Sequence, residues 1–173
     1  DANPATFWLT NPDNTVRRNV AAGSVGFGFW YALPAAPTGF STGQPDRPRN
    51  TPLAEFSDNV AHSNRRPGLN VDDGPKPDGT TETTSFNPRA GAVSNGAPVV
   101  ATFRNFSAWK HTSRAVWLRG SSQRLDNAVL ADNLIGATFA SSETFFENSL
   151  VVGESGNLTP SPNASFPIRG YEF

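Results

Sequence analysis

The chain has 173 residues, of which 36% are hydrophobic, with 15 glycines, 15 prolines and a formal net charge of −1 at pH 7. The small charge gives no sign of a polycationic surface for nucleic acid, and no apolar run approaches the roughly 20 residues of a membrane-spanning helix. Because cysteine is absent, thiol nucleophiles, disulfides and cysteine-based metal sites are excluded.

An asparagine recurs along the chain with similar residues after it. The five anchors are Asn19, Asn59, Asn105, Asn127 and Asn148. Nine residues after the anchor, four of the five copies have Gly or Asn, which tolerate a left-handed backbone. Position ten is apolar in all copies and position twelve in the first four, the period-2 pattern of a strand that faces a core. The last two spacings, 22 and 21 residues, indicate the length of one bare repeat.

The first two spacings, 40 and 46 residues, correspond to one repeat plus a long insertion. The insertions are Leu33–Leu53 and Asp73–Pro98, and both are rich in the Pro, Gly, Ser and Thr residues typical of irregular loops. Both insertions follow the apolar residues at positions ten and twelve after an anchor, and so begin at the same phase of the repeat. We therefore expect them to leave the same edge of the stack and to form one wall of a single unit that spans residues 1–173.

The repeat length favours one fold class. A coil of 21–22 residues is too short for two helices and fits three short strands joined by three bends. Successive coils would pair in parallel at a spacing of about 4.8 Å. We predict an all-β fold, a right-handed parallel β-helix (a solenoid) of about six coils, in which the anchor amides stack as a ladder. A leucine-rich repeat has a similar period, but its dense leucine pattern is missing.

Four segments are similar to a known family: Thr6–Pro34 (TFWLTNPDNTVRRNVAAGSVGFGFWYALP), Pro52–Leu69, Asn105–Gly120 and Phe166–Phe173. They resemble the β-helix region of G8-domain proteins, which include the cell-migration-inducing hyaluronidase, the transmembrane hyaluronidase, fibrocystin and bacterial secreted proteins. The resemblance implies a secreted, periplasmic or cell-surface β-helix that handles polysaccharide. The G8 domain is not evident, and the family's catalytic Asp and His residues do not map onto this chain, so the resemblance implies no activity.

The wall formed by the two insertions carries charged candidates for ligand contact. Asp72 and Asp73 could act as a glycosidase pair, bind Ca²⁺ or form a turn with the Gly-Pro that follows, and we favour the turn. Lys76 lies on the same wall. Asp73 and Arg119 both stand fourteen residues after an anchor, which predicts a surface ion pair worth about 0–1 kcal/mol. Further charged residues of this wall are Asp46, Arg47, Arg49, Asp78 and Arg89.

Aromatic residues could stack on sugar rings. The candidates are Trp8, Trp30, Tyr31, Trp109 and Trp117. Trp30 and Trp109 are out of the core phase, although burial beneath a loop is the alternative for them. Trp117 is in the core phase and is predicted to be structural. We interpret His62 and His111 as structural histidines, since neither has an identifiable catalytic partner. Asn105 begins an Asn-x-Ser sequon but, as a ladder anchor, is expected to be inaccessible.

Both ends of the sequence read as strands without a polar cap. This predicts a fragment of a longer solenoid, or a unit docked on partner chains that cap its ends. We predict a non-catalytic extracellular or periplasmic scaffold with a carbohydrate- or protein-contact face. The alternatives are part of a polysaccharide-degrading, hyaluronidase-like enzyme and an accessory structural subunit of a larger complex. No catalytic residue, metal ligand or cofactor is assigned, and Ca²⁺ is the one ion considered.

Overall fold

The computed structural model describes residues 3–156 and 169–172, with side chains for the first range, and is built almost entirely from β-strands. Residues 166–168 and 173 of the Phe166–Phe173 segment lie outside the described part of the chain. The strands are β1 (Ala5–Leu9), β2 (Thr15–Arg17), β3 (Val20–Ala22), β4 (Phe27–Tyr31), β5 (Glu55–Ser57), β6 (Val60–His62), β7 (Leu69–Val71), β8 (Gly74–Pro75), β9 (Thr81–Glu82), β10 (Ala101–Arg104), β11 (Ser107–Trp109), β12 (Arg114–Asp126), β13 (Val129–Ala131), β14 (Ile135–Glu147), β15 (Leu150–Val152) and β16 (Arg169–Glu172); the 3-10 helices are η1 (Gly39–Ser41) and η2 (Ala90–Ala92).

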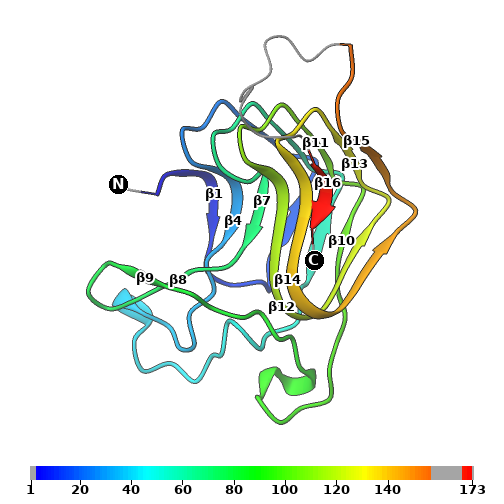
Figure 1. Ribbon diagram of the computed structural model, residues 1–173. Helices are drawn as coiled ribbons and strands as arrows, with labels where there is room; N and C mark the ends of the chain where they lie inside the picture. The colour runs from blue at the N-terminus through cyan, green and yellow to red at the C-terminus, as the bar shows by residue number, and fades with distance from the viewer. Residues whose placement is uncertain (1–2, 157–168, 173) are drawn as a thin grey trace.

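Successive passes of the chain pair in parallel and form curled sheets (Figure 1). One sheet has nine strands, a second has the order β15-β13-β11-β6-β3, and the antiparallel hairpin β8-β9 stands apart. β12 and β14, with 13 residues each, are long enough to bend between two walls of the nine-stranded sheet. Val116–Leu118 of β12 pair with β7, whereas its Gln123–Asp126 pair with β10. The predicted all-β, mainly parallel architecture is confirmed, and its hand and six-coil count stay predictions.

The strand register differs by one residue from the alignment on asparagine. The paired strands end at Arg17, Ser57, Arg104, Asp126 and Glu147. The residues that follow all have φ between 52° and 56°, and they are Arg18, Asp58, Asn105, Asn127 and Asn148. Asn19 and Asn59 therefore lie one position later in the coil than the other three anchors. Because side chains alternate between the two faces of a strand, counting from Asn59 and from Asn105 assigns the residues of β12 to the wrong face.

The two insertions leave neighbouring strands, β4 and β7, and project from one edge of the stack (Figure 1). They also bind each other. The amide of Asn87 donates to the Arg49 carbonyl at 2.8 Å, and the Arg49 guanidinium lies 3.2 Å from the Glu82 carboxylate. The second insertion is fixed to the sheet where the Phe86 carbonyl accepts the Ser121 amide at 3.0 Å. Gly120, with φ of 135°, permits this approach, because a Cβ there would overlap the Phe86 carbonyl oxygen.

Aromatic side chains fill much of the space between the sheets. Phe56 lies between Phe29 and Phe103, at ring-centroid distances of 5.4 and 5.5 Å, with both pairs edge to face. Tyr31 contacts the same cluster, 6.2 Å from Phe56. Edge-to-face pairs of this kind add about 0.5–1.5 kcal/mol beyond the burial of their area. The cluster therefore makes the stack a rigid support for the side chains on its outer faces.

We expect Tyr31→Phe to leave the free energy of unfolding unchanged or to raise it by about 1 kcal/mol. The Tyr31 side chain is only 1% exposed, and its hydroxyl has no hydrogen-bond partner among the described residues. Burial also raises the pKa of this hydroxyl. Removing a desolvated, unpaired hydroxyl removes a penalty and no interaction. Urea denaturation measures the change, and a loss above about 1 kcal/mol would reveal a partner for the hydroxyl.

Candidate functional site

Asp72 lies at the start of the second insertion, and both of its carboxylate oxygens are occupied. Its Oδ2 lies 2.7 Å from Arg119 Nε and accepts Trp117 Nε1–H at 2.9 Å. Its Oδ1 accepts the backbone amides of Asp73 at 2.8 Å and Thr84 at 3.2 Å. The residue is 7% exposed. These four donors make the carboxylate a fixed point that joins the insertion to the sheet.

The predicted ion pair between Asp73 and Arg119 is wrong. Val71 pairs with Leu118, so the next residues, Asp72 and Arg119, stand opposite each other. The anchor alignment was one residue off and selected Asp73. This residue has φ of 57°, a backbone conformation found in turns. Burial, and then the neighbouring Asp72 carboxylate, raise the pKa of Asp73, which Arg119 opposes.

The Asp72-Asp73 pair does not have the geometry of a glycosidase site. A general acid or base needs a carboxyl oxygen free to exchange a proton with substrate, whereas the Asp72 oxygens are held by four donors. Within residues 3–156, no group of three or more His, Asp or Glu side chains could hold a metal ion. Gly74 and Pro75, which follow the pair, form strand β8, so Asp72 joins this strand to the sheet.

Trp117 is on the outer face of its sheet, so its predicted place in the core is wrong. Val116 and Leu118 are fully buried, and strand alternation directs Trp117 to the other side. Its ring lies between two guanidinium groups, with Arg114 at 4.8 Å and Arg119 at 5.3 Å from the centroid. The ring therefore packs against the guanidinium of the ion pair between Arg119 and Asp72.

Trp30 also lies on this outer face but is covered. It is 4% exposed, packs on Phe27 at 4.7 Å and donates its Nε1–H to the Asp72 carbonyl at 2.8 Å. Trp8, its register partner on β1, stacks on it at 6.2 Å with an interplanar angle of 28°. Trp8 is 58% exposed. Of these two stacked rings, Trp8 is therefore the one that a ligand can reach.

A groove of about 840 Å³ lies between Trp8 and the β8-β9 hairpin. Its polar lining includes Asn3, Thr38, Lys76, Thr80 and Thr81. A second hollow of about 190 Å³ shares Trp8, Thr38 and Pro75 with it, so the two adjoin along the tryptophan ring. The structure thus brings together Lys76 and Trp30 of the predicted contact residues, with Asp72 and Arg119 behind Trp30. Alternation with the inward Phe7 and Leu9 is the sequence signal that places Trp8 outside.

Trp109 lies elsewhere, on the outer face of the five-stranded sheet. It is 36% exposed and stacks almost flat on His62, at 5.0 Å and 6°. The same face carries exposed Val20, Val129 and Leu150. Trp109 is therefore separated from the groove, because Trp8 belongs to the other sheet.

Comparison with known proteins shows which proteins the chain is similar to. Residues 1–69 match the CEMIP beta-helix family model. The chain is 38% identical over 89% of its length to the human cell migration-inducing and hyaluronan-binding protein, covering 13% of that protein. It is 32% identical over 97% of its length to human cell surface hyaluronidase CEMIP2, covering 15%, and 30% identical over 94% to mouse fibrocystin-L, covering 4%.

The predicted resemblance to the β-helix region of CEMIP-like and fibrocystin-like proteins is confirmed. The CEMIP beta-helix match includes β1 and β4, which carry Trp8 and Trp30. The chain spans about 15% or less of the length of these relatives. In the part of the chain with described structure, no helix has the length and apolar character to cross a bilayer.

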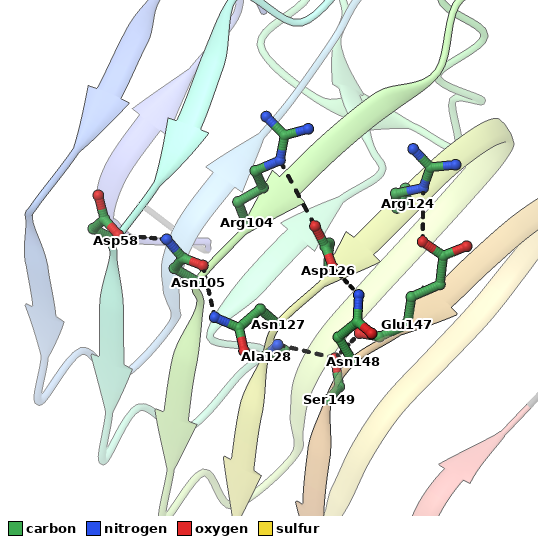
Figure 2. A network of polar contacts seen from close by, with 10 residues as sticks. All are labelled: Asp58, Arg104, Asn105, Arg124, Asp126, Asn127, Ala128, Glu147, Asn148 and Ser149. Carbon is green, nitrogen blue, oxygen red and sulfur yellow. Dashed lines mark hydrogen bonds and ion pairs between the residues drawn. The ribbon is translucent and has the colours of Figure 1, made fainter.

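Three of the anchors, Asn105, Asn127 and Asn148, belong to a group of polar side chains at one corner of the stack (Figure 2). Asn127 Nδ2 donates to Asn105 Oδ1 at 2.9 Å, and Asn105 Nδ2 donates to Asp58 Oδ1 at 2.7 Å. Asn148 Nδ2 donates to Asp126 Oδ1 at 2.9 Å. Asn105 is exposed, so its predicted inaccessibility is wrong.

The remaining two anchors form a separate pair. Asn19 Nδ2 donates to Asn59 Oδ1 at 3.2 Å, while Asn59 Nδ2 donates to the Val16 carbonyl at 2.8 Å. Asn59 is buried, unlike Asn105. This difference in environment follows from the one-residue difference in register between the first two anchors and the other three.

A second polar column, at another bend, is fully buried and was not predicted. It consists of Asn64, His111 and Asn133. Asn64 Oδ1 accepts the Ser24 amide at 2.8 Å, His111 Nδ1 accepts the Asn64 amide at 3.3 Å, and Asn133 Oδ1 accepts the His111 amide at 3.1 Å. The three stand six residues after Asp58, Asn105 and Asn127, a signal that counting from the corrected register reveals.

Proposed function

We propose that the chain is one structural unit, a right-handed parallel β-solenoid of about six coils over residues 1–173, in an extracellular protein. In this proposal it is a scaffold whose groove beside Trp8 contacts polysaccharide. Parallel pairing through successive coils supports the solenoid. The names of relatives, which include a hyaluronan-binding protein and a cell surface hyaluronidase, support a role with polysaccharide outside the cell.

One observation carries the contact role: Trp8 is 58% exposed, although it is held on a paired strand and backed by a buried tryptophan. A large exposed aromatic ring offers an apolar platform for the C–H face of a pyranose. Polar groups of the β8-β9 hairpin face it across the groove and can bond sugar hydroxyls. Since strand pairing fixes the ring, little entropy is lost on binding.

A polysaccharide-degrading enzyme is the runner-up. It draws support from the name of the hyaluronidase relative, whereas the Asp72 carboxylate, with its four donors, offers no free general acid or base. Contact with other protein chains is a further proposal. It is favoured by the exposed apolar side chains of Val20, Val129 and Leu150 on the outer face of the five-stranded sheet.

Replacing Trp8 with Ala is expected to weaken oligosaccharide binding about fivefold or more, by analogy with the roughly 1–3 kcal/mol of a nucleic-acid base stacked on an aromatic side chain. Because the side chain is exposed, the fold should persist. Titration calorimetry measures binding, and Trp109→Ala is the matched control, since it removes an exposed tryptophan from the other sheet. Equal losses of binding affinity in both variants, or no loss in Trp8→Ala, would contradict the proposal that the groove binds the oligosaccharide.

A further inference from the structure

The groove beside Trp8 has almost no net positive charge. Of its described lining residues, Lys76 alone is charged. The Lys76 ammonium lies 3.8 Å from the carboxylate of Asp78 on the same hairpin. This partner reduces the field that the ammonium presents to a ligand.

Asp78 is fixed in its ionised form. Its Oδ1 accepts the hydroxyl of Thr80 at 2.6 Å and the amide of Thr80 at 2.9 Å. These hydrogen bonds lower the pKa of Asp78. The negative charge beside Lys76 is therefore a permanent feature of the hairpin at neutral pH.

Near the ends of the groove, too, the positively charged side chains lie beside anions or backbone carbonyls. The adjoining hollow adds the carboxylate of Asp46 to the lining beside Trp8. Arg49, on the first insertion, is paired with Glu82 at 3.2 Å. Arg47 donates to the backbone carbonyls of Pro45 and Asp46 and lines a different hollow. No described cation is thus placed in the groove without an anion beside it.

We propose that this groove binds a neutral polysaccharide and discriminates against anionic ones such as hyaluronan. The inference rests on the proposed function and specifies its ligand class. A sugar carboxylate in the groove would be desolvated without a free Lys or Arg to receive it, and would approach Asp78 and Asp46. A neutral sugar needs an apolar platform and groups that bond hydroxyls, which Trp8, Thr38 and Thr81 supply.

The test compares two hexasaccharides on the whole chain, using titration calorimetry at low and physiological salt. Chitohexaose is the neutral probe and a hyaluronan hexasaccharide is the anionic probe, and both contain N-acetylglucosamine. Cellohexaose serves as a second neutral probe. We expect a neutral probe to bind at least tenfold more tightly than hyaluronan, with little dependence on salt, and Trp8→Ala to abolish the difference. Asp46→Lys, at an exposed position, should increase the affinity for hyaluronan several-fold at low salt.

The outcomes separate the two proposals. Suppose that hyaluronan binds as tightly as the neutral probes or more tightly, and that its binding is lost in Trp8→Ala. This result would overturn the proposed neutral ligand class and would still support the groove as the binding site. Binding of no probe, or binding of all probes that persists in Trp8→Ala, would overturn the groove and with it the inference. Tight neutral binding that is lost in Trp8→Ala, together with weak hyaluronan binding, supports both.

Discussion

Replacing Asp72 with Ala is expected to lower the free energy of unfolding by about 3 kcal/mol. The substitution leaves the partly buried Arg119 guanidinium without its carboxylate and removes the acceptor of Trp117 Nε1–H. It also leaves the buried amide of Thr84 unpaired. Chemical denaturation followed by circular dichroism measures the change. An effect this large requires the whole network, because an exposed ion pair contributes no more than about 1 kcal/mol.

Two isosteric variants separate the network from simple loss of charge. Asp72→Asn keeps an oxygen for the backbone amides, but its amide group faces the donors of Arg119 and Trp117, so it should destabilise nearly as much as Asp72→Ala. Asp73→Asn removes an adjacent charge, retains a residue type that tolerates φ of 57° and should change stability by less than about 0.5 kcal/mol. If Asp73→Asn is as damaging as Asp72→Asn, the assignment of the network is wrong.

The same network links the fold to the groove. The Asp72 carbonyl holds Trp30 through its Nε1–H, and Trp30 backs the exposed ring of Trp8. Asp72 also holds the start of the insertion whose hairpin forms the opposite side of the groove. We therefore expect the Asp72 variants to weaken sugar binding as well, by disordering both sides of the groove.

The parallel stack and its loops could be predicted because they depend on period and composition. A repeat near 22 residues with apolar alternation favours short stacked strands, and loops inserted at one phase must leave one edge. Register could not be obtained in the same way. An alignment on residue identity follows the asparagines, whereas the coils of the structure coincide at a bend with positive φ. Arg18 and Asp58 occupy that bend in the first two coils, where Asn occupies it later.

This one-residue difference in register leaves the predicted fold unchanged but alters which side chains are predicted to meet. The shift of one residue places Trp117 in the core, where the structure has its neighbours Val116 and Leu118. It also pairs Arg119 with Asp73, whereas the partner in the structure is Asp72. The groove could not be predicted from the sequence for another reason. It depends on how the β8-β9 hairpin folds back over Trp8, which is more than 60 residues away in the chain. A path of that length through irregular loops carries no periodic signal.

His111 should make the protein less stable in mild acid. Its Nδ1 accepts the Asn64 amide, while Nε2 is buried close to Gly68 and the ring also interacts with the Ala61 backbone. Burial lowers the pKa of His111 from 6.5 to about 4. Between these values the unfolded chain binds the proton that the folded chain excludes, so stability is complete above pH 6.5 and falls as the pH decreases toward 4. The loss amounts to roughly 3 kcal/mol.

His111→Asn tests this directly, because Asn64 and Asn133 perform the same function in the neighbouring coils with amide side chains. Each accepts a backbone amide through Oδ1 and donates Nδ2–H to a carbonyl, that of Ala21 or Ala108. The variant should lose about 1 kcal/mol at pH 7 through its smaller volume, yet decline less in acid than the wild type. Urea denaturation at several pH values measures both, and His62→Asn, on the outer face, is the control that should keep the wild-type decline. Parallel declines in His111→Asn and wild type would assign the acid sensitivity to the carboxylates, since nothing else in the buried column can titrate.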